Sequence, residues 1–332
     1  MLFLAWEEFK KEKSSKLDVL LFEQELEHNI FKLATDLRME RYKHDKYIGF
    51  YISDPKSRHI HKATVRDRVL HHAIFSVLNP IFEPTFIPNS FSCRVGKGSH
   101  KGVLCLRGML NKESRNNTRA CYALKCDVRK FFDSIDHDIL MRILDRKIKD
   151  KKTMNLLREI IGSFESRKSA LFRKKGVPIG NLTSQIFANI YMNEFDQFMK
   201  HKLKVKHYAR YTDDFVVVSR DREYLLSLIP VISEFLGSVL KLELHPKKVE
   251  IIPYHKGVDF LGYIVFPHHI LIRQKTKKRI IKKLMLRLEQ YQDGIIEKKT
   301  FQATLQSYLG ILSHANAYEF SENLKNNFFL LD

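Results

Sequence analysis

Tyr211-Thr212-Asp213-Asp214 places two adjacent carboxylates in a tight turn. The residues on either side, 207–211 and 215–218, have the composition of β-strands, so we expect the Asp pair at the tip of a hairpin anchored by a buried strand. Carboxylate oxygens suit Mg²⁺, which keeps several waters and takes one or two carboxylates together with substrate phosphates. For these four residues taken alone, an ordinary solvated Asp-rich turn is the alternative interpretation.

A third carboxylate, Asp127, ends the short apolar stretch 120–127, which predicts a fully buried strand. An acid in that position is costly unless it is paired or bound to a metal. On a strand beside the hairpin it would give three convergent carboxylates, enough for two divalent ions spaced for in-line displacement at phosphorus. A helix cap or an ion pair with Arg129 or Lys130 is the alternative.

The composition points to a polyanionic partner. The 332 residues include 58 Lys and Arg against 38 Asp and Glu, which gives a net charge of +20. The basic residues are spread along the whole chain. Such an excess of positive charge favours nucleic acid as the partner; the alternatives are that the charge keeps the protein soluble or binds an anionic membrane surface. The apolar runs are too short to span a bilayer and the first residues lack a secretion signal, so we expect a cytoplasmic protein with no membrane partner. Four cysteines without a Cys-x-x-Cys pair argue against a disulfide or zinc framework.

The remaining pattern alternates helix, hairpin, helix and strand, which predicts an α+β fold. The strands are expected to form one antiparallel sheet with helices packed on one face. From Lys275 onward a helix is expected with apolar residues inward and a strongly basic outer face. The predicted helices cover residues 1–50, 66–78 (closing at Pro80), a segment capped by Asp136, a segment reaching Lys202, and 221–240, and the further strands cover 241–245, 249–253 and 258–266.

The order of these motifs resembles that of reverse transcriptases. Asp127 with an aromatic residue five positions on, the Tyr-x-Asp-Asp turn, Leu244-His245-Pro246-Lys247-Lys248 and Phe260-Leu261-Gly262 follow one another as in that family. Upstream, Pro55-Lys56-x-Arg58 and Arg66-Asp67-Arg68-Val69 resemble the finger motifs of its bacterial members. The resemblance runs from about residue 16 to about residue 318. It implies a right-hand polymerase with N-terminal helices and fingers over 1–118, a palm with an antiparallel sheet over 119–264 (with finger segments around 145–180) and a helical thumb over 265–332.

Within the family, the chain resembles the enzymes of diversity-generating retroelements. Most reverse transcriptases have Gln before Gly180 and Pro after Ser184, whereas this chain has Ile179 and Gln185. Residues 90–100 and 307–310 also resemble that subfamily. This implies an RNA-directed DNA polymerase that copies a template-repeat RNA into cDNA with errors at template adenines, together with a small basic oligomeric accessory protein. Alternatives are a retron, defence or group II intron-derived reverse transcriptase, an RNA-templated RNA polymerase, and a non-catalytic RNA-binding protein on a polymerase scaffold.

The resemblance also implies roles for individual residues. Asp127, Asp213 and Asp214, with the backbone carbonyl of Val128, would bind two Mg²⁺ ions, for which Mn²⁺ can substitute. Lys248 would protonate departing pyrophosphate, or contact a phosphate or the template instead. The dNTP would meet Lys56 and Arg58 at its triphosphate and Phe132 under its sugar. Ile179 and Gly180 would lie close to the nucleotide, and Gln185, with Ser184, would face the template base. Primer and template would contact Tyr211, Phe260, Leu261, Gly262, Arg94 and Lys97.

Several of these roles have plainer alternatives. Lys56 and Arg58 fit a solvated basic loop, and Phe132 fits core packing because Phe131 is equally apolar. A buried strand with a tight turn explains Phe260-Leu261-Gly262 nearly as well as a primer grip, and Ser184 would serve as a helix cap. Ile179 supports the sharpest hypothesis: an aliphatic side chain removes a hydrogen bond to the nucleotide, which lowers discrimination by about 1 kcal/mol.

Overall fold

A four-stranded antiparallel sheet in the order β4-β5-β3-β6 carries the acidic turn. The computed structural model describes residues 1–52, 57–164 and 174–328. The predicted hairpin is confirmed, since β4 and β5 pair with Tyr211 opposite Asp214, and β3 lies on the other side of β5 with Asp127 opposite Asp214. The four strands are β3 (Tyr122–Asp127), β4 (His207–Tyr211), β5 (Asp214–Ser219) and β6 (Glu250–Pro253).

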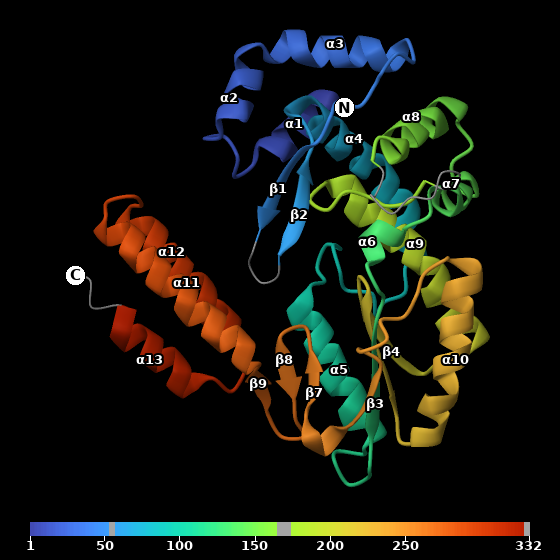
Figure 1. Ribbon diagram of the computed structural model, residues 1–332, viewed down its shortest axis with the longest axis vertical. Coiled ribbons are helices and arrows are strands. Elements are labelled where there is room, and N and C mark those ends of the chain that lie inside the picture. Colours follow the sequence, from blue (N-terminus) through green and yellow to red (C-terminus); the bar gives the residue numbers. More distant parts are fainter. Residues whose placement is uncertain (53–56, 165–173, 329–332) are drawn as a thin grey trace.

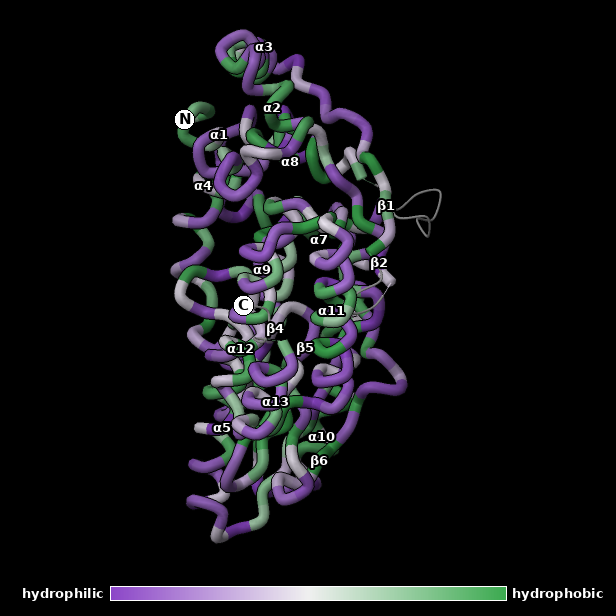
Figure 2. The backbone as a smooth tube through the Cα atoms, turned by 90° about the vertical axis from the view of Figure 1, so that its left-hand side faces the viewer, coloured by the Kyte–Doolittle hydropathy of each residue, from purple (hydrophilic) through white to green (hydrophobic). Residues whose placement is uncertain are grey.

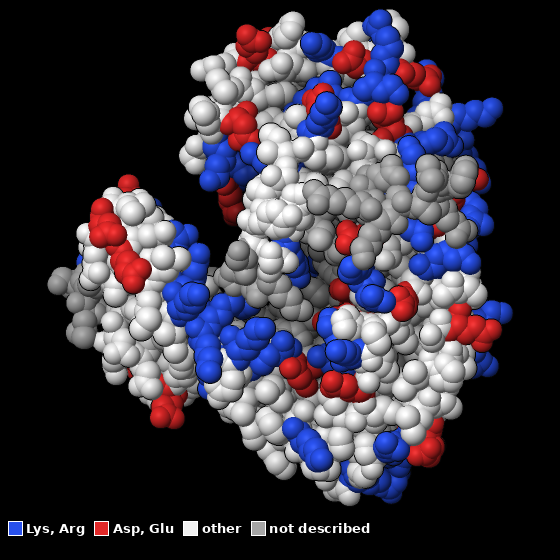
Figure 3. Space-filling view, in the orientation of Figure 1, with Lys and Arg blue, Asp and Glu red and all other residues white. Residues whose placement is uncertain are grey.

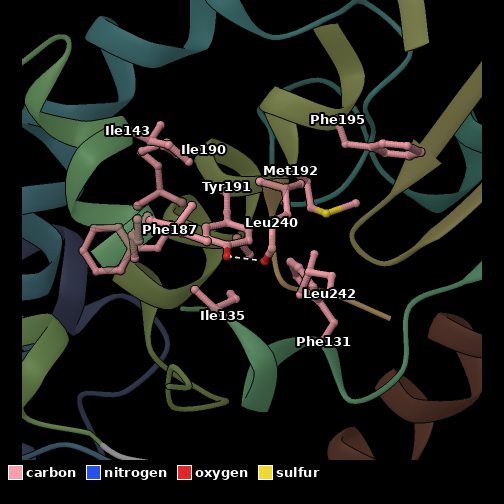
Figure 4. Packing of buried hydrophobic residues seen from close by; sticks show 14 of the residues in the cluster. Phe131, Ile135, Ile143, Phe187, Ile190, Tyr191, Met192, Phe195, Leu240 and Leu242 are labelled. Atoms are coloured by element: carbon pink, nitrogen blue, oxygen red, sulfur yellow. Dashed lines mark hydrogen bonds between the residues drawn. The ribbon is translucent and has the colours of Figure 1, made fainter. Parts of the chain in front are cut away.

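Both faces of this sheet are covered, rather than the one face predicted. Leu124 and Cys126 of β3 belong to a core shared with helices, whereas Ala123 between them belongs to a second core, as the alternation of side chains along a strand requires. The first core contains α9 (Leu182–Gln197), whose Tyr191 hydroxyl donates to the Leu240 carbonyl at 2.6 Å (Figure 4). Around it lie α6 (Phe131–Ser134), α7 (His137–Asp145), α8 (Lys151–Gly162), the π-helical turn η2 (Phe198–Lys202) and α10 (Arg222–Val239).

The second face packs against α5 (Ser99–Glu113) and a separate small sheet. That sheet has the order β7-β8-β9, formed by β7 (Val258–Phe260), β8 (Tyr263–Val265) and β9 (Ile270–Ile272). The prediction of one strand over 258–266 is therefore wrong. Leu261 and Gly262 have φ values of 51° and 92°, and two successive positive φ angles reverse the chain in a two-residue hairpin turn. Residues 241–245 form no strand either, and only Leu244 makes an isolated bridge, to Val128.

The N-terminal unit consists of helices and a pair of antiparallel strands, called the N-terminal hairpin below (Figure 1). The helices are α1 (Leu2–Lys10), α2 (Leu17–Gln24), α3 (Leu26–Arg38) and α4 (Val65–Phe82), and β1 (Ile48–Ile52) pairs with β2 (Arg58–Lys62). Helix α4 continues through Pro80 instead of ending there, because proline has a φ compatible with a helix and the flanking Leu78 and Phe82 are buried in the core. It is followed by the 3₁₀ turn η1 (Glu83–Thr85). The helical prediction for residues 1–50 is correct only up to residue 38.

The C-terminal bundle consists of α11 (Gln274–Gln292), α12 (Lys298–Leu312) and α13 (Tyr318–Phe328). It stands apart from the N-terminal unit in Figure 1, and hydrophilic and hydrophobic residues alternate along α11 in Figure 2. The predicted amphipathic helix is confirmed, since Ile280 and Leu284 are buried while Lys275, Lys278 and Lys282 are exposed. In the described part of the chain, none of the helices has both the length and the apolar character needed to cross a membrane.

Candidate active site

Three carboxylates lie at one end of the central sheet. Asp127 ends β3 and Asp214 begins β5, and the two are register partners in the antiparallel ladder. Asp213 occupies the turn between β4 and β5, where its carbonyl accepts a hydrogen bond of 3.2 Å from the amide of Val128. A backbone hydrogen bond therefore joins the turn between β4 and β5 to the end of β3. It brings together Asp127, Asp213 and Asp214, which the sequence predicted to converge.

The carboxylates repel one another. Burial, followed by the charges of Asp127 and Asp214, raises the pKa of Asp213 to about 6. Burial also raises the pKa of Asp214; the charge of Lys125 opposes this effect and that of Asp127 adds to it. Acids whose pKa values are raised by burial and by neighbouring carboxylates, as those of Asp213 and Asp214 are, typically occur at functional sites, because a bound cation offsets both the desolvation and the repulsion.

Lys248 supplies a positive charge at the site. Its Nζ lies 2.7 Å from Oδ2 of Asp127, and its side chain is 39% exposed. The loop that carries it is held in place because the amide of His245 donates to the Asp127 carbonyl (2.8 Å) and the amide of Lys248 donates to the His245 carbonyl (2.9 Å). The structure thus places Lys248 beside Asp127, and its role toward pyrophosphate stays a prediction.

The donor set suits a divalent cation, although the side chains do not form a ready-made cage. Within the described ranges, no group of three or more His, Cys, Asp or Glu side chains is arranged to hold a metal ion. Lys248 instead occupies an oxygen of Asp127. The three carboxylates are nevertheless hard oxygen donors beside one another, which is the chemistry that Mg²⁺ and Mn²⁺ prefer.

The two neighbouring phenylalanines have different environments. Phe131 is 2% exposed and belongs to the first core, whereas Phe132 is half-buried beside it. The Phe132 carbonyl accepts a hydrogen bond of 2.9 Å from the amide of Val177. Val177 lies in the loop of residues 176–181, which carries the predicted nucleotide contacts Ile179 and Gly180 and is called the nucleotide loop below. Phe132, rather than Phe131, is therefore the partly exposed residue of the two, and its backbone is bonded to that loop.

The nucleotide loop is fastened to the N-terminal hairpin. The His61 amide on β2 donates to the Ile179 carbonyl, and Nδ2 of Asn181 donates to the His61 carbonyl, both at 3.2 Å. Gly180 has a φ of +115°, and a Cβ there would lie 2.9 Å from Cγ2 of Ile60. Only glycine satisfies both the backbone angle and the close approach.

The other predicted nucleotide contacts are distributed around this loop. Arg58 is exposed at the start of β2, and Gln185 is half-buried in the first turn of α9. Lys56 and Pro55 lie outside the described residues. Ser184 does not cap α9, because the helix begins at Leu182 with Asn181 in the cap position.

The predicted primer and template residues are not equally available. Phe260 is fully buried and supports the turn made by Leu261 and Gly262, while Tyr211 is half-buried beside Asp214. The Arg94 guanidinium is 7% exposed and pairs with Glu83. Its role in template binding stays a prediction, and one that this packing disfavours.

Three further hydrogen bonds hold the segment around Arg94. The Arg94 guanidinium also donates to the carbonyls of Ile87 (2.7 Å) and Ser90 (2.9 Å). Lys97 is half-buried and donates to the Pro88 carbonyl at 2.8 Å. Both cations therefore stabilise the loop before α5.

Arg210 was not predicted from the sequence as a site residue. It is fully buried in β4 directly before the acidic turn, and it pairs with Asp196 of α9. A charged residue inside an otherwise apolar strand is the signal that marks it, because such residues are rarely buried without a partner.

Comparison with known proteins assigns the chain to a family. The family model described as reverse transcriptase (RNA-dependent DNA polymerase) matches residues 44–265. Protein YkfC of Escherichia coli K12 is 27% identical over 259 residues, covering 68% of this chain and 66% of YkfC. The group II intron-encoded protein LtrA of Lactococcus lactis subsp. cremoris is 24% identical over 306 residues, covering 71% of this chain and 49% of LtrA. The chain thus spans between about half and two thirds of the length of these relatives.

A solved structure shows the same fold. Apo telomerase from Candida tropicalis superposes with a TM-score of 0.54 at 13% identity, covering 85% of this chain and 56% of that one. Together with the antiparallel sheet and its helices, this confirms the predicted right-hand polymerase fold. Because the matched region spans most of the chain and contains Asp127, Asp213 and Asp214, the protein belongs to the reverse transcriptase (RNA-dependent DNA polymerase) family.

Proposed function

We propose that the protein synthesises DNA on an RNA template by nucleotidyl transfer, using dNTPs and a primer. The observation that carries this proposal is the register of Asp127 opposite Asp214, with Asp213 in the adjoining turn, inside the region that the family model matches. A decayed polymerase scaffold that only binds RNA would not require three acids to be kept together at the cost of mutual repulsion.

Asp127, Asp213 and Asp214 would hold the divalent cations, Mg²⁺ or Mn²⁺, with the Val128 carbonyl as a further donor. When bound, such ions supply Lewis acidity at the 3′-hydroxyl and at the phosphates. Lys248 would then exchange its contact with Asp127 for the phosphates of the nucleotide. From that position its ammonium group would neutralise or protonate departing pyrophosphate.

Phe132 would select the sugar. Phe132 is half-buried, and its backbone carbonyl accepts a hydrogen bond from the Val177 amide of the nucleotide loop. A ring under the sugar excludes a 2′-hydroxyl sterically, so dNTPs are favoured over NTPs, and an RNA-templated RNA polymerase is the less favoured alternative.

The charge distribution fits a template and a cDNA product. Lys and Arg side chains gather along the inner edge of the C-terminal bundle and continue onto the central part of the molecule, where the surface is hollowed between the bundle and the body (Figure 3). The exposed Lys275, Lys278 and Lys282 of α11 contribute to the charge of that bundle. Such a surface would track a phosphate backbone without reading its sequence.

Two lineages within the family are supported by different observations. The similarity to LtrA, an intron-encoded protein, supports the group II intron-derived alternative better than the diversity-generating retroelement interpretation. Ile179 and Gln185 remain the observations that favour the latter, with its template-repeat RNA, adenine-directed errors and accessory protein. The genes beside this one would distinguish the two, because a diversity-generating element needs paired near-identical repeats next to a variable target gene.

Primer extension tests the proposed activity. The purified protein is expected to extend an oligo-dT primer on poly(rA) in the presence of Mg²⁺ and not after chelation. Asp213→Asn should abolish extension while leaving binding of the primer–template unchanged, since the substitution removes a metal ligand and not a nucleic-acid contact. Extension by this variant at the wild-type rate, or binding without extension by the wild-type protein, would contradict the proposal.

A further inference from the structure

Arg210 and Asp196 form a fully buried ion pair behind the acidic turn. The guanidinium donates from Nε to Oδ1 of Asp196 at 2.8 Å and from Nη2 to Oδ2 at 2.6 Å, and both side chains have 0% exposure. Burying two charges gives little net stability, because apolar side chains of similar volume are often as good or better. The pair therefore calls for a role other than packing.

The remaining donors of Arg210 reach the turn and its neighbour. Nη1 donates to the carbonyl of Thr212 at 2.9 Å, and Nη2 donates to Oγ of Ser90 at 3.1 Å. Thr212 has a φ of 56°, a left-handed conformation that a β-branched residue adopts only when its surroundings enforce it. Its carbonyl belongs to the peptide bond that leads into Asp213, so a donor that orients the carbonyl also orients the start of Asp213.

A second contact holds the same residue from its side chain. Oγ1 of Thr212 donates to Oγ of Ser92 at 2.6 Å, and the Ser92 carbonyl accepts from Nδ2 of Asn189 at 2.8 Å. Asn189 and Asp196 are both buried residues of α9, seven positions apart, which places them on the same face of the helix. Helix α9 thus holds Thr212 at two points, through Ser92 and through Arg210.

The backbone completes this arrangement. The Arg210 amide donates to the Asn89 carbonyl at 3.0 Å, and the Phe91 amide donates to the Arg210 carbonyl at 2.9 Å. Ser90 consequently lies beside Arg210 as an isolated parallel bridge. The segment that contains Ser90 and Ser92 is therefore fixed against β4 independently of the side chains.

We propose that Arg210 is a positioning residue for the acidic turn. Paired with Asp196, it holds Thr212 in its left-handed conformation and thereby sets the direction of the Asp213 and Asp214 carboxylates. The same pair couples the turn to α9, whose first turn carries Gln185 beside the nucleotide loop. This inference rests on the proposed polymerase function, because its consequence is measured in nucleotide incorporation.

Arg210→Lys tests the proposal. Lysine keeps the positive charge beside Asp196 but lacks the planar fork that donates to Asp196 and Thr212 together. The kcat for single-nucleotide incorporation should fall about 10- to 100-fold, as displacements near 1 Å can cause. The Mg²⁺ concentration for half-maximal rate should rise severalfold, while KM for the dNTP stays within about twofold. An unchanged Mg²⁺ dependence in this variant would overturn the proposal.

Tyr208→Phe is the matched control. The Tyr208 hydroxyl donates to the same Oδ1 of Asp196 at 2.7 Å, but Tyr208 makes no hydrogen bond with Thr212. Its loss should lower the melting temperature and leave kcat and the Mg²⁺ dependence at wild-type values, measured well below that temperature. If both variants change the Mg²⁺ dependence equally, Arg210 acts only through stability and the proposal fails.

Two further variants keep the test decisive if Arg210→Lys does not fold. Ser92→Ala removes the partner of the Thr212 hydroxyl and leaves the buried pair intact, so it should give the same change in Mg²⁺ dependence, smaller in size. Thr212→Asn in the Ser92→Ala background should recover part of that change, because asparagine adopts the left-handed conformation more readily. A wild-type Mg²⁺ dependence in Ser92→Ala, or no recovery by Thr212→Asn in that background, would refute the inference.

Primer extension by the wild-type protein distinguishes a failure of the positioning role from a failure of the proposed function. If it extends primers and the Arg210 and Ser92 variants resemble Tyr208→Phe, only the positioning role is wrong. If it extends no primer at all, the proposed function is wrong and the positioning role falls with it.

Discussion

The ammonium group of Lys248 lies 2.7 Å from a carboxylate oxygen of Asp127, although the two residues are 121 positions apart. The contact occupies an oxygen that the proposed function assigns to a divalent cation. Under the proposed function Lys248 would therefore have two alternative partners, Asp127 before the cation binds and the phosphates of the nucleotide afterwards.

Lys248→Ala should separate these two roles. Because the side chain is 39% exposed, its ion pair contributes little, and we expect stability to change by less than about 1 kcal/mol. The rate of incorporation should nevertheless fall about 100-fold or more if Lys248 acts on pyrophosphate. Single-turnover incorporation measures the rate, and Lys248→Arg, which retains the charge but hardly releases a proton, distinguishes acid catalysis from neutralisation. A full rate in Lys248→Ala would exclude both roles.

The raised pKa of Asp213 predicts how stability depends on pH. Its pKa in the folded protein is about 6, above the usual value of 3.8, so Asp213 stabilises the folded state at acidic pH and this contribution is lost as the pH rises through about 6. Replacing Asp213 by Asn should therefore raise stability at pH 8 by about 1 to 2 kcal/mol relative to wild type, allowing for partial solvent exposure, and have little effect near pH 4. Chemical denaturation at the two pH values, without divalent cations, measures the difference.

Added Mg²⁺ provides the complementary measurement. Mg²⁺ should stabilise the wild-type protein at pH 8, because it binds the ionised carboxylates of the folded state. The effect should weaken below pH 6 as Asp213 becomes protonated, and it should be much smaller in Asp213→Asn. An equal gain in melting temperature for both proteins would show that Mg²⁺ binds elsewhere.

Phe132→Ala should reduce the preference for deoxynucleotides. Removing the ring opens space for a 2′-hydroxyl, so the ratio of kcat/KM for dNTP to that for NTP should fall about 10- to 100-fold. Phe131→Leu is the matched control, since it perturbs the adjacent buried ring without touching the free surface of Phe132. If Phe131→Leu changes the ratio and Phe132→Ala does not, the two rings have been assigned the wrong way round.

Gly180→Ala should loosen the nucleotide loop from the N-terminal hairpin. Alanine would have to adopt the φ of +115°, and its methyl group would lie 2.9 Å from Cγ2 of Ile60. We therefore expect a destabilisation of about 1 to 3 kcal/mol and a raised KM for the dNTP. Gly237→Ala is the control, because that glycine lies inside α10 with open space around it and alanine favours helix. Adding Ile60→Ala relieves the steric contact but not the backbone strain, so only partial recovery is expected.

Ile179→Gln tests the fidelity hypothesis. A glutamine side chain restores a hydrogen-bonding group next to the nucleotide, and the error frequency should fall about fivefold for a contact of about 1 kcal/mol. Sequencing cDNA from a template rich in all four bases gives the frequency at each base. Should errors at adenine persist unchanged in Ile179→Gln, Ile179 plays no part in them.

Local sequence was sufficient for the elements that set up the carboxylates. The hairpin of β4 and β5 follows from two β-rich runs around a polar turn, and the caps at Asp136 and Asp221 follow from side chains that bond amides two or three residues ahead. Asp127 could be identified because a charge at the end of an apolar strand is unusual. Each of these signals lies within a few residues, where backbone geometry and side-chain chemistry act directly.

Contacts between distant segments were not predictable in this way. The division of the strands into two sheets and the hydrogen bonds between the nucleotide loop and His61 depend on which surfaces meet after folding. The buried pair of Arg210 and Asp196 joins β4 to α9, and hydrophobic periodicity carries no information on such polar pairing. The sequence by itself therefore identified the carboxylates proposed to perform the chemistry. The contacts that orient them, such as those of Arg210 with Asp196 and Thr212, were decided only by the tertiary structure, because they are hydrogen bonds between segments distant in sequence or depend on such bonds.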